Sequence, residues 1–385
     1  MTAEQIHKGL EGVVIDETRL SRVFGDEGRL IFRGYDIEDI ADHGDFEETL
    51  YLMWHGELPT ESEYESFANE LAAQREVPDE ILDLLADQAA VDQHPMDVLQ
   101  ASVSALAGYD DDRKADPEND LDAVVGMGQS IAAKLATITA AYQRLRDGTE
   151  PISPREDLSH AANFLYMLHG EEPEQAHVDA MDTALQIHME HGTNASTFTT
   201  RVIASTLANP YEAVAGGIGA LAGPLHGGAN QDVLNMLEDI QESEQSAGEW
   251  IDDRLDEGGV VYGYGHRVYN VKDPRAYILQ DHAERLIEEG DGDDTWYKLA
   301  REVESHMDDL GLEEKGIAPN VDFFSGTVYK QMGIPTDVYT NLFTMSRIGG
   351  WIGHIIEQYS DNRIIRPRAR YVGDVDLTWT PMADR

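Results

Sequence analysis

The chain has 385 residues, no cysteine, and 74 Asp plus Glu against 28 Lys plus Arg, which gives a formal net charge of −46. Its length predicts two domains or one large one, and its 41% hydrophobic residues are enough for a core, so a disordered chain is excluded. The absence of cysteine excludes disulfides, cysteine-ligated zinc and thiol nucleophiles, and the acidic balance argues against nucleic acid as a partner.

The N-terminal residues contain no apolar run typical of a signal peptide, so we expect a cytoplasmic protein. A strand pattern follows them. Residues 13–24 and 29–32 partly alternate apolar and polar side chains around the glycine-bearing turn 25–28, which is typical of a β-hairpin. The sequence therefore predicts a short N-terminal hairpin and little other strand.

Helical periodicity dominates the rest of the chain. Thr60 and Glu63 form the pattern of a capping box, and apolar residues follow on one helical face. Similar apolar stripes predict helices over residues 121–146, 158–168, 178–189, 195–207, 231–240, 274–288, 295–310 and 336–359. Helix C-termini are indicated by glycines at positions 56, 148 and 170. We predict an all-α fold of more than a dozen helices, with at most the short N-terminal hairpin.

Two glycine-rich segments divide the predicted helices. The first, residues 216–228, lies in an uncharged stretch too rich in glycine to span a membrane, and we predict a hinge loop there. The second covers residues 258–265. If both are loops, they border a separate unit. The predicted division is a large helical domain of residues 1–225 and 328–385 and a smaller mobile helical domain of residues 226–327, with no membrane contact.

Two short patterns suggest ligands but have ordinary explanations. Residues 217–222 match the letters of a dinucleotide fingerprint, which works only between a strand and a helix, and here residues 209–214 are a turn that enters a helix. His188 and His191 are three residues apart on one helical face, a spacing compatible with metal ligation, but the HExxH pattern is absent. We expect neither nucleotide nor metal, and we assign these histidines to substrate binding or to hydrogen bonds in the core.

One histidine lies in a glycine-rich turn. His226 precedes the helix predicted from Gln231, and the partial positive charge of a helix N-terminus disfavours imidazolium. A neutral imidazole donates one hydrogen bond to a developing enolate without being a strong acid. Taken alone, the segment is explained equally well by an ordinary exposed turn histidine.

Residues 263–275 carry a more specific pattern. Glycines bring the backbone close to a ligand, His266 follows them, and Arg275 lies just inside the helix that Pro274 begins. A cation at that place suits a carboxylate that is attracted to a helix N-terminus.

Further along the chain, one aspartate and several arginines are candidate site residues. Asp322 lies at a predicted helix start beside two phenylalanines, where most aspartates are N-caps. Arg347 is conspicuous in so acidic a chain, and so is a cluster of four arginines at positions 363, 366, 368 and 370.

Taken together, these segments resemble the citrate synthase family. Residues 263–275 resemble the family's signature in order and spacing, and the segments around His226 and Asp322 resemble its other two active-site segments. The family's substrate-binding segments are matched by residues 188–197, 346–347 and 366–367. The resemblance spans residues 10–372.

The resemblance implies an all-α homodimer and a role for each group. Asp322 would act as general base on the methyl group of acetyl-CoA, and His226 would stabilise the enol or enolate through the thioester oxygen. His266 would polarise the ketone carbonyl of oxaloacetate and act as an acid. The oxaloacetate carboxylates would be held by His191, Arg275, Arg347 and, from the partner subunit, Arg366. Hydrolysis of the citryl thioester would then yield citrate.

The resemblance also implies acetyl-CoA as a co-substrate and no tightly bound cofactor. Family members often carry a basic residue at the position of Asn270, where the coenzyme phosphates are expected. We expect Arg267, Lys272 and Arg368 to supply phosphate contacts instead.

Two alternatives remain open at this point. A 2-methylcitrate synthase uses the same machinery on propionyl-CoA, and one methylene is worth only about 1–3 kcal/mol of discrimination. A non-catalytic scaffold of the same fold is disfavoured, because His226, His266 and Asp322 are all present.

The surplus of acidic residues indicates the salt concentration in which the protein works. The Debye length is about 10 Å at 0.1 M salt and about 3 Å at 1 M, so repulsion among surface carboxylates fades only in concentrated salt. We therefore predict a halophilic protein adapted to a cytoplasm of molar salt. An acidic protein of an ordinary cytoplasm is the alternative.

Overall fold

The computed structural model describes residues 6–289 and 294–385, and this part of the chain is mainly helical. It contains sixteen α-helices, one three-stranded sheet and several short 3-10 helices. The predicted all-α fold is confirmed.

The N-terminal hairpin is present but shorter than predicted. Strands β1 (Ser21–Phe24) and β2 (Arg29–Phe32) pair antiparallel, with Phe24 opposite Arg29 across the turn. A two-residue strand, β3 (Tyr35–Asp36), extends the sheet in the order β1-β2-β3. Residues 13–20 were expected to be strand, and this was wrong: within residues 6–289 and 294–385 no strand pairs with them, and Val14 is exposed. An alternating pattern predicts the strand only where a second strand can pair with it.

The helices of the first half follow the predicted periodicity. Thr60 and Glu63 form the predicted capping box, and Gly56 and Gly170 end helices in the left-handed conformation. In chain order the helices are α1 (Ile37–His43), α2 (Phe46–His55), α3 (Glu61–Ala73), α4 (Asp79–Ala89), α5 (Pro95–Leu106), α6 (Leu121–Arg146), α7 (His160–His169) and α8 (Gln175–Ile187).

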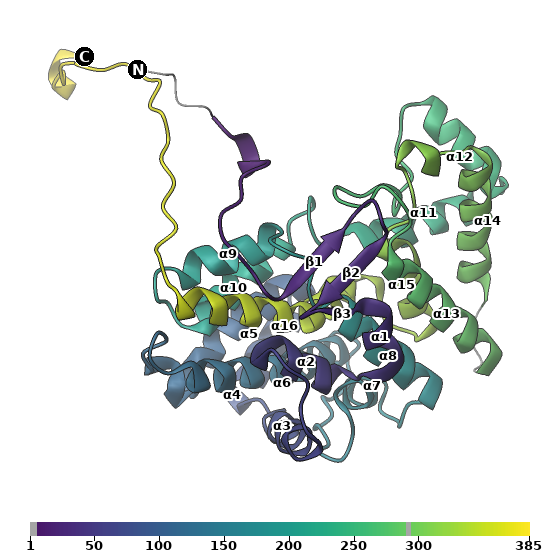
Figure 1. Ribbon diagram of the computed structural model, residues 1–385, viewed down its shortest axis with the longest axis horizontal. Coiled ribbons are helices and arrows are strands. Elements are labelled where there is room, and N and C mark those ends of the chain that lie inside the picture. Colours follow the sequence, from purple (N-terminus) through teal and green to yellow (C-terminus); the bar gives the residue numbers. More distant parts are fainter. Residues whose placement is uncertain (1–5, 290–293) are drawn as a thin grey trace.

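The second half of the chain continues the helical pattern. They are α9 (Ala195–Ala204), α10 (Pro210–Leu221), α11 (Ala229–Glu242), α12 (Ala247–Asp256), α13 (Pro274–Glu289), α14 (Thr295–Asp309), α15 (Val321–Gln331) and α16 (Tyr339–Ser360). Figure 1 shows α11, α12 and α14 gathered at one side of the molecule, with α13 and α15 between them and the larger group of helices. The proposed boundaries of the two domains remain a prediction.

The predicted hinge loop at residues 216–228 is partly wrong. Helix α10 includes residues 216–221, so only the following residues leave helical conformation. A side chain at Gly217 would come within 2.6 Å of Thr200 and 3.2 Å of Trp351. These glycines therefore let α10 pack closely against α9 and α16, a use that sequence alone does not distinguish from a hinge. The second segment, residues 258–265, is a loop as predicted.

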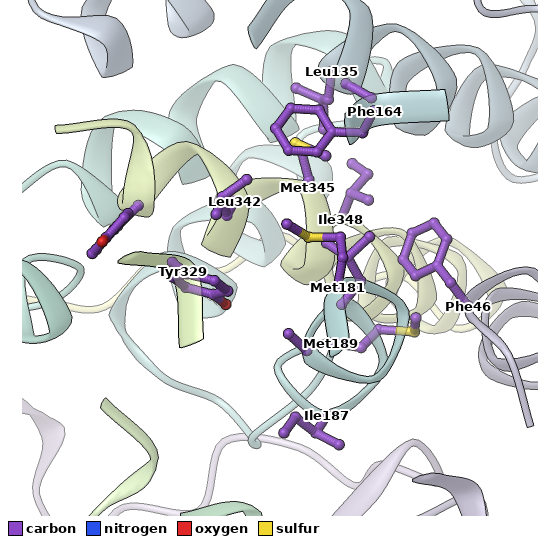
Figure 2. Packing of buried hydrophobic residues seen from close by; sticks show 14 of the residues in the cluster. Phe46, Leu135, Phe164, Met181, Ile187, Met189, Tyr329, Leu342, Met345 and Ile348 are labelled. Atoms are coloured by element: carbon purple, nitrogen blue, oxygen red, sulfur yellow. The ribbon is translucent and has the colours of Figure 1, made fainter. Parts of the chain in front are cut away.

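The core is built around α16. Met345, Ile348 and Trp351 of this helix are fully buried. Figure 2 shows side chains of α2, α6, α7 and α8 packed around Met345 and Ile348, among them Phe46 and Phe164. Helix α6 is long and apolar enough to cross a membrane, but 78% of its most apolar window is buried inside the protein, as expected for a core helix.

Both terminal segments leave the body of the molecule. Residues 361–385 extend away from the end of α16 (Figure 1), and they expose Tyr371, Val372 and Trp379. Val14 is similarly exposed near the other end of the chain.

Candidate active site

The glycine-rich loop between α12 and α13 runs beside the residues that precede α15. Tyr264 and Pro319 form an antiparallel β-bridge, and backbone hydrogen bonds of 2.9 and 2.8 Å flank it. Because His266 follows the bridge on one segment and Asp322 follows it on the other, this pairing brings the two residues into one region of the structure.

Asp322 is the second residue of α15 and is not its N-cap. That position belongs to Asn320, whose Oδ1 accepts the backbone N–H of Asp322 at 3.0 Å. No described residue donates a hydrogen bond to the Asp322 carboxylate. Burial raises its pKa to about 6; Asp273 adds to this rise, while Arg275 and Arg347 limit it. At neutral pH the group is ionised and more basic than an exposed aspartate.

The tautomer of His266 is fixed by its own loop. Its Nδ1 accepts the backbone N–H groups of Val268 at 3.0 Å and Tyr269 at 3.1 Å. The proton of the neutral ring therefore lies on Nε2, which is free to donate. Burial, followed by the charge of Arg275, lowers the pKa of His266 to about 4, so the ring is neutral at physiological pH.

His226 lies in the turn before α11, and its ring is oriented by Ser196. Its Nε2 accepts the Ser196 backbone N–H at 3.2 Å and lies 2.8 Å from the Ser196 hydroxyl. Nδ1 is then the nitrogen that donates. Burial, followed by the charge of Arg347, lowers the pKa of His226 to about 4. The ring is neutral, as predicted, but burial is the main cause rather than the helix N-terminus considered from the sequence.

Two arginines are buried beside these groups. Arg275 forms a two-point ion pair with Asp273, at 3.0 and 2.7 Å. Arg347 donates through Nε to the carbonyl of His188 at 2.9 Å, and its guanidinium lies 4.8 Å from the ring centre of Phe343. Both side chains are about as buried as core residues. Two buried guanidinium groups suit an anionic ligand, and within the described part of the chain Arg347 is the one that forms no ion pair with a carboxylate.

His191 meets the His266 loop. Its ring centre lies 5.1 Å from that of His266 and 5.5 Å from that of Tyr269. His188, by contrast, is buried and its Nδ1 hydrogen-bonds the Ala184 carbonyl at 2.8 Å, as a core histidine does. The described residues contain no group of three or more His, Cys, Asp or Glu side chains arranged to hold a metal.

Several polar atoms at the site are buried and have no hydrogen-bond partner among the residues that the structure describes. They are Nη1 of Arg347, Nε2 of His191 and the hydroxyl of Tyr269. A buried donor without an acceptor costs free energy, so three such atoms near one another indicate a place for a polar ligand. Tyr269 was not predicted, since nothing in its local sequence distinguishes it from a packing tyrosine.

A buried carboxylate behind His191 was also missed. Glu190 is fully buried, and its Oε1 accepts from the Ser21 hydroxyl at 3.1 Å, the Gly192 N–H at 2.5 Å and His354 Nε2 at 3.1 Å. It also interacts electrostatically with Arg347. Its only signal in the sequence is its place next to His191.

The four remaining predicted cations are exposed or paired elsewhere. Arg267 is exposed, and Lys272 forms a buried ion pair with Glu304 at 2.7 Å. Arg366 and Arg368 are exposed on the C-terminal segment, away from α16. The structure thus brings together His191, His226, His266, Arg275, Asp322 and Arg347. The coenzyme and partner-subunit roles of the other four stay predictions.

The sequence has close relatives among known proteins. A family model described as citrate synthase, C-terminal domain, matches residues 9–368. A citrate synthase of Haloferax volcanii is 49% identical over 381 residues, covering 99% of each chain. A 2-methylcitrate synthase of Mycobacterium tuberculosis is 40% identical over 368 residues, covering 96% of this chain and 91% of the relative.

Solved structures agree with the sequence relatives. The citrate synthase of Pyrobaculum aerophilum has a TM-score of 0.93 at 37% identity, covering 99% of this chain and 95% of that one. The citrate synthase of Thermoplasma acidophilum, solved as a ternary complex with carboxymethyl coenzyme A and oxaloacetate, has a TM-score of 0.88 at 33% identity, covering 99% and 100%. By fold and sequence, the chain belongs to the citrate synthase family.

Proposed function

We propose that the protein condenses acetyl-CoA with oxaloacetate and hydrolyses the citryl thioester to citrate and CoA. One observation carries the proposal: the buried, more basic Asp322 carboxylate interacts electrostatically with Arg275 and Arg347, and Nη1 of Arg347 has no hydrogen-bond partner among the described residues. Asp322 removes a methyl proton of the acetyl group. A thioester α-proton is only weakly acidic, so this base succeeds only where the enolate is stabilised as it forms.

The two catalytic histidines divide the remaining work. His226 donates one hydrogen bond from Nδ1 to the thioester oxygen and so stabilises the enol or enolate. His266 donates from Nε2 to the ketone oxygen of oxaloacetate, polarises that carbonyl and supplies a proton as the carbon–carbon bond forms. The fixed tautomers of both rings support this assignment.

Oxaloacetate needs two anion sites. We assign its carboxylates to Arg275, Arg347 and His191, and the unpaired Arg347 Nη1 supports this choice. Arg366 reaches the site from the partner subunit of a homodimer in this proposal. The exposed apolar residues of the terminal segments support such a partner, because a second copy would cover them.

Acetyl-CoA acts as a co-substrate in this scheme, with no tightly bound cofactor. Arg267 and Arg368 are exposed cations suited to the coenzyme phosphates. Lys272 would first have to leave Glu304, so we rank it behind them.

Release of the CoA thiol tests the function and its nearest alternative together. We expect thiol release with oxaloacetate plus acetyl-CoA, and a kcat/KM for acetyl-CoA at least about tenfold above that for propionyl-CoA. The existence of 2-methylcitrate synthases at 40% identity makes this comparison necessary. Omitting oxaloacetate is the control, since simple thioester hydrolysis would continue without it. A preference for propionyl-CoA would favour the alternative function, and no release with either would contradict both.

Salt is expected to stabilise the fold by screening. With 74 acidic against 28 basic side chains, carboxylates repel across the surface in dilute buffer. Raising KCl from about 0.1 M to about 2 M should raise the melting temperature by at least about 5 °C. Sucrose at matched concentration is the control, because it favours compact states without screening charge. An unchanged melting temperature in KCl would refute the prediction of adaptation to molar salt.

A further inference from the structure

The turn of the N-terminal hairpin lies against the loop that follows His266. We call residues 25–28 the hairpin turn and residues 266–273 the His266 loop. The Asn270 N–H donates to the carbonyl of Gly25 at 3.1 Å, and the Asn270 Nδ2 donates to Asp26 Oδ1 at 2.6 Å. Figure 1 shows the hairpin reaching from the larger group of helices toward α11 and α15.

Glycines allow the two segments to touch backbone to backbone. A Cβ at Gly25 would overlap the carbonyl oxygen of Val268. Gly28 has a φ of +61°, and a Cβ there would lie 3.0 Å from Val271 Cγ2. The contact therefore depends on the absence of side chains on the hairpin turn.

The shape of the His266 loop determines how the His266 ring is held. The two N–H groups that bind His266 Nδ1 belong to Val268 and Tyr269, directly before Asn270. The loop ends where the Asp273 N–H donates to the carbonyl of Pro319 at 3.0 Å. A displacement of the loop at its middle would therefore move the ring and its hydrogen-bond donors together.

The hairpin itself is firmly anchored. Leu30 and Phe32 of β2 are fully buried in the core. At the base of β1, the Ser21 hydroxyl donates to Glu190, the residue before His191. The same hairpin thus contacts the His191 side of the site at one end and the His266 loop at the other.

We propose that this hairpin is the template that sets the distance between His191 and His266, and that Asp26 and Asn270 are positioning residues for the condensation. The inference rests on the proposed function and identifies the structural element that positions His266 in that site. It also gives a use for Asn270, which stands where family members often have a basic residue: its amide holds the loop on Asp26.

Amide exchange in the free enzyme tests the contact without requiring turnover. Asn270→Asp places a second carboxylate against Asp26, and the repulsion should release the loop. We expect deuterium uptake in residues 266–273 to accelerate at least about tenfold and kcat to fall. Adding Asp26→Asn restores a donor and an acceptor with their roles reversed, so the double variant should recover both slow exchange and turnover.

The double variant separates positioning from direct coenzyme binding. If Asn270 acted on the coenzyme, the single and double variants would share a raised KM for acetyl-CoA and would exchange like the unaltered protein. That result would overturn the proposal, as would rapid exchange that persists in the double variant. A lack of thiol release by the unaltered protein would instead refute the proposed function, while the exchange data would stand.

A steric variant provides a second test should Asn270→Asp fail to fold. Gly25→Ala keeps both polar groups but prevents the close approach to Val268, so uptake in the His266 loop should rise in it as well. Gly108→Ala is the matched control, because a Cβ at Gly108 meets nothing within 4 Å. Equal exchange in the two alanine variants would contradict the template role.

Discussion

Replacing Asp322 by asparagine is expected to lower kcat about 10³-fold, because an amide cannot accept the methyl proton of the acetyl group. Oxaloacetate binding should survive, since Arg275 and Arg347 are unchanged. The measurement is thiol release together with calorimetric titration of oxaloacetate. Near-normal turnover in this variant would refute the assignment of the base.

The same variant should not lose stability at neutral pH. Burial raises the pKa of Asp322 from 3.8 to about 6, so the folded state binds the proton more tightly than the unfolded state does. Ionisation of this group therefore costs stability as pH rises through that interval. Asparagine removes the cost, and its melting temperature at pH 7 should equal or exceed that of the unaltered protein. A lower melting temperature together with lost activity would point to a structural defect instead.

Asp322 should also determine how kcat/KM depends on pH. In the unaltered protein kcat/KM should fall below about pH 6 as Asp322 becomes protonated. His226 and His266 do not contribute to this fall in kcat/KM, because their pKa values are lowered to about 4 and both rings stay neutral near pH 6. The residual kcat/KM of Asp322→Asn should not fall below pH 6 in this way. If the same fall persists in the variant, the titration belongs to another group.

Helical periodicity predicted the helices well because one face of each helix packs on a shared core. The range 121–146 matches α6 at both ends, with Asp120 as the N-cap. The error at residues 216–221 has a physical origin. Glycine serves both hinges and close helix contacts, and the deciding neighbours, Thr200 and Trp351, lie on two other helices, α9 and α16.

The candidate site was predictable where chemistry is local. His266 and Arg275 stand in one continuous segment, and their environment follows from the glycines and the helix start around them. Asp322 was identified by resemblance, while the ordinary expectation for its position was an N-cap. The structure gives that position to Asn320, two residues earlier, which leaves the Asp322 carboxylate available.

Long-range partners could not be predicted from the sequence. Glu190 meets Ser21 across 169 residues, and Asn270 meets Asp26 across 244. Each of these side chains is an ordinary polar residue in its own segment. Which partner it contacts depends on how the hairpin packs on the helices, and hydrophobic periodicity does not specify that packing.

Replacing His226 by alanine is expected to cost about 3 kcal/mol of transition-state stabilisation, or roughly 10²-fold in kcat. The Ser196 N–H holds Nε2, so the lost group is a single neutral donor at Nδ1. His226→Asn is the matched variant, because its amide can donate from nearly the same place. It should recover part of the loss. Ser196→Ala keeps the backbone N–H and should have a smaller effect.

The step affected by His226 can be isolated from condensation. With an unreactive dicarboxylate analogue in place of oxaloacetate, the enzyme should still exchange the methyl protons of acetyl-CoA with deuterated water. His226→Ala should slow this exchange about as much as it slows kcat, because the enolate loses its donor in both cases. His266→Ala should slow condensation but retain exchange, since its Nε2 acts on the ketone of the other substrate. If both variants lost proton exchange equally, the assignment of His226 to the thioester oxygen and His266 to the ketone oxygen would be wrong.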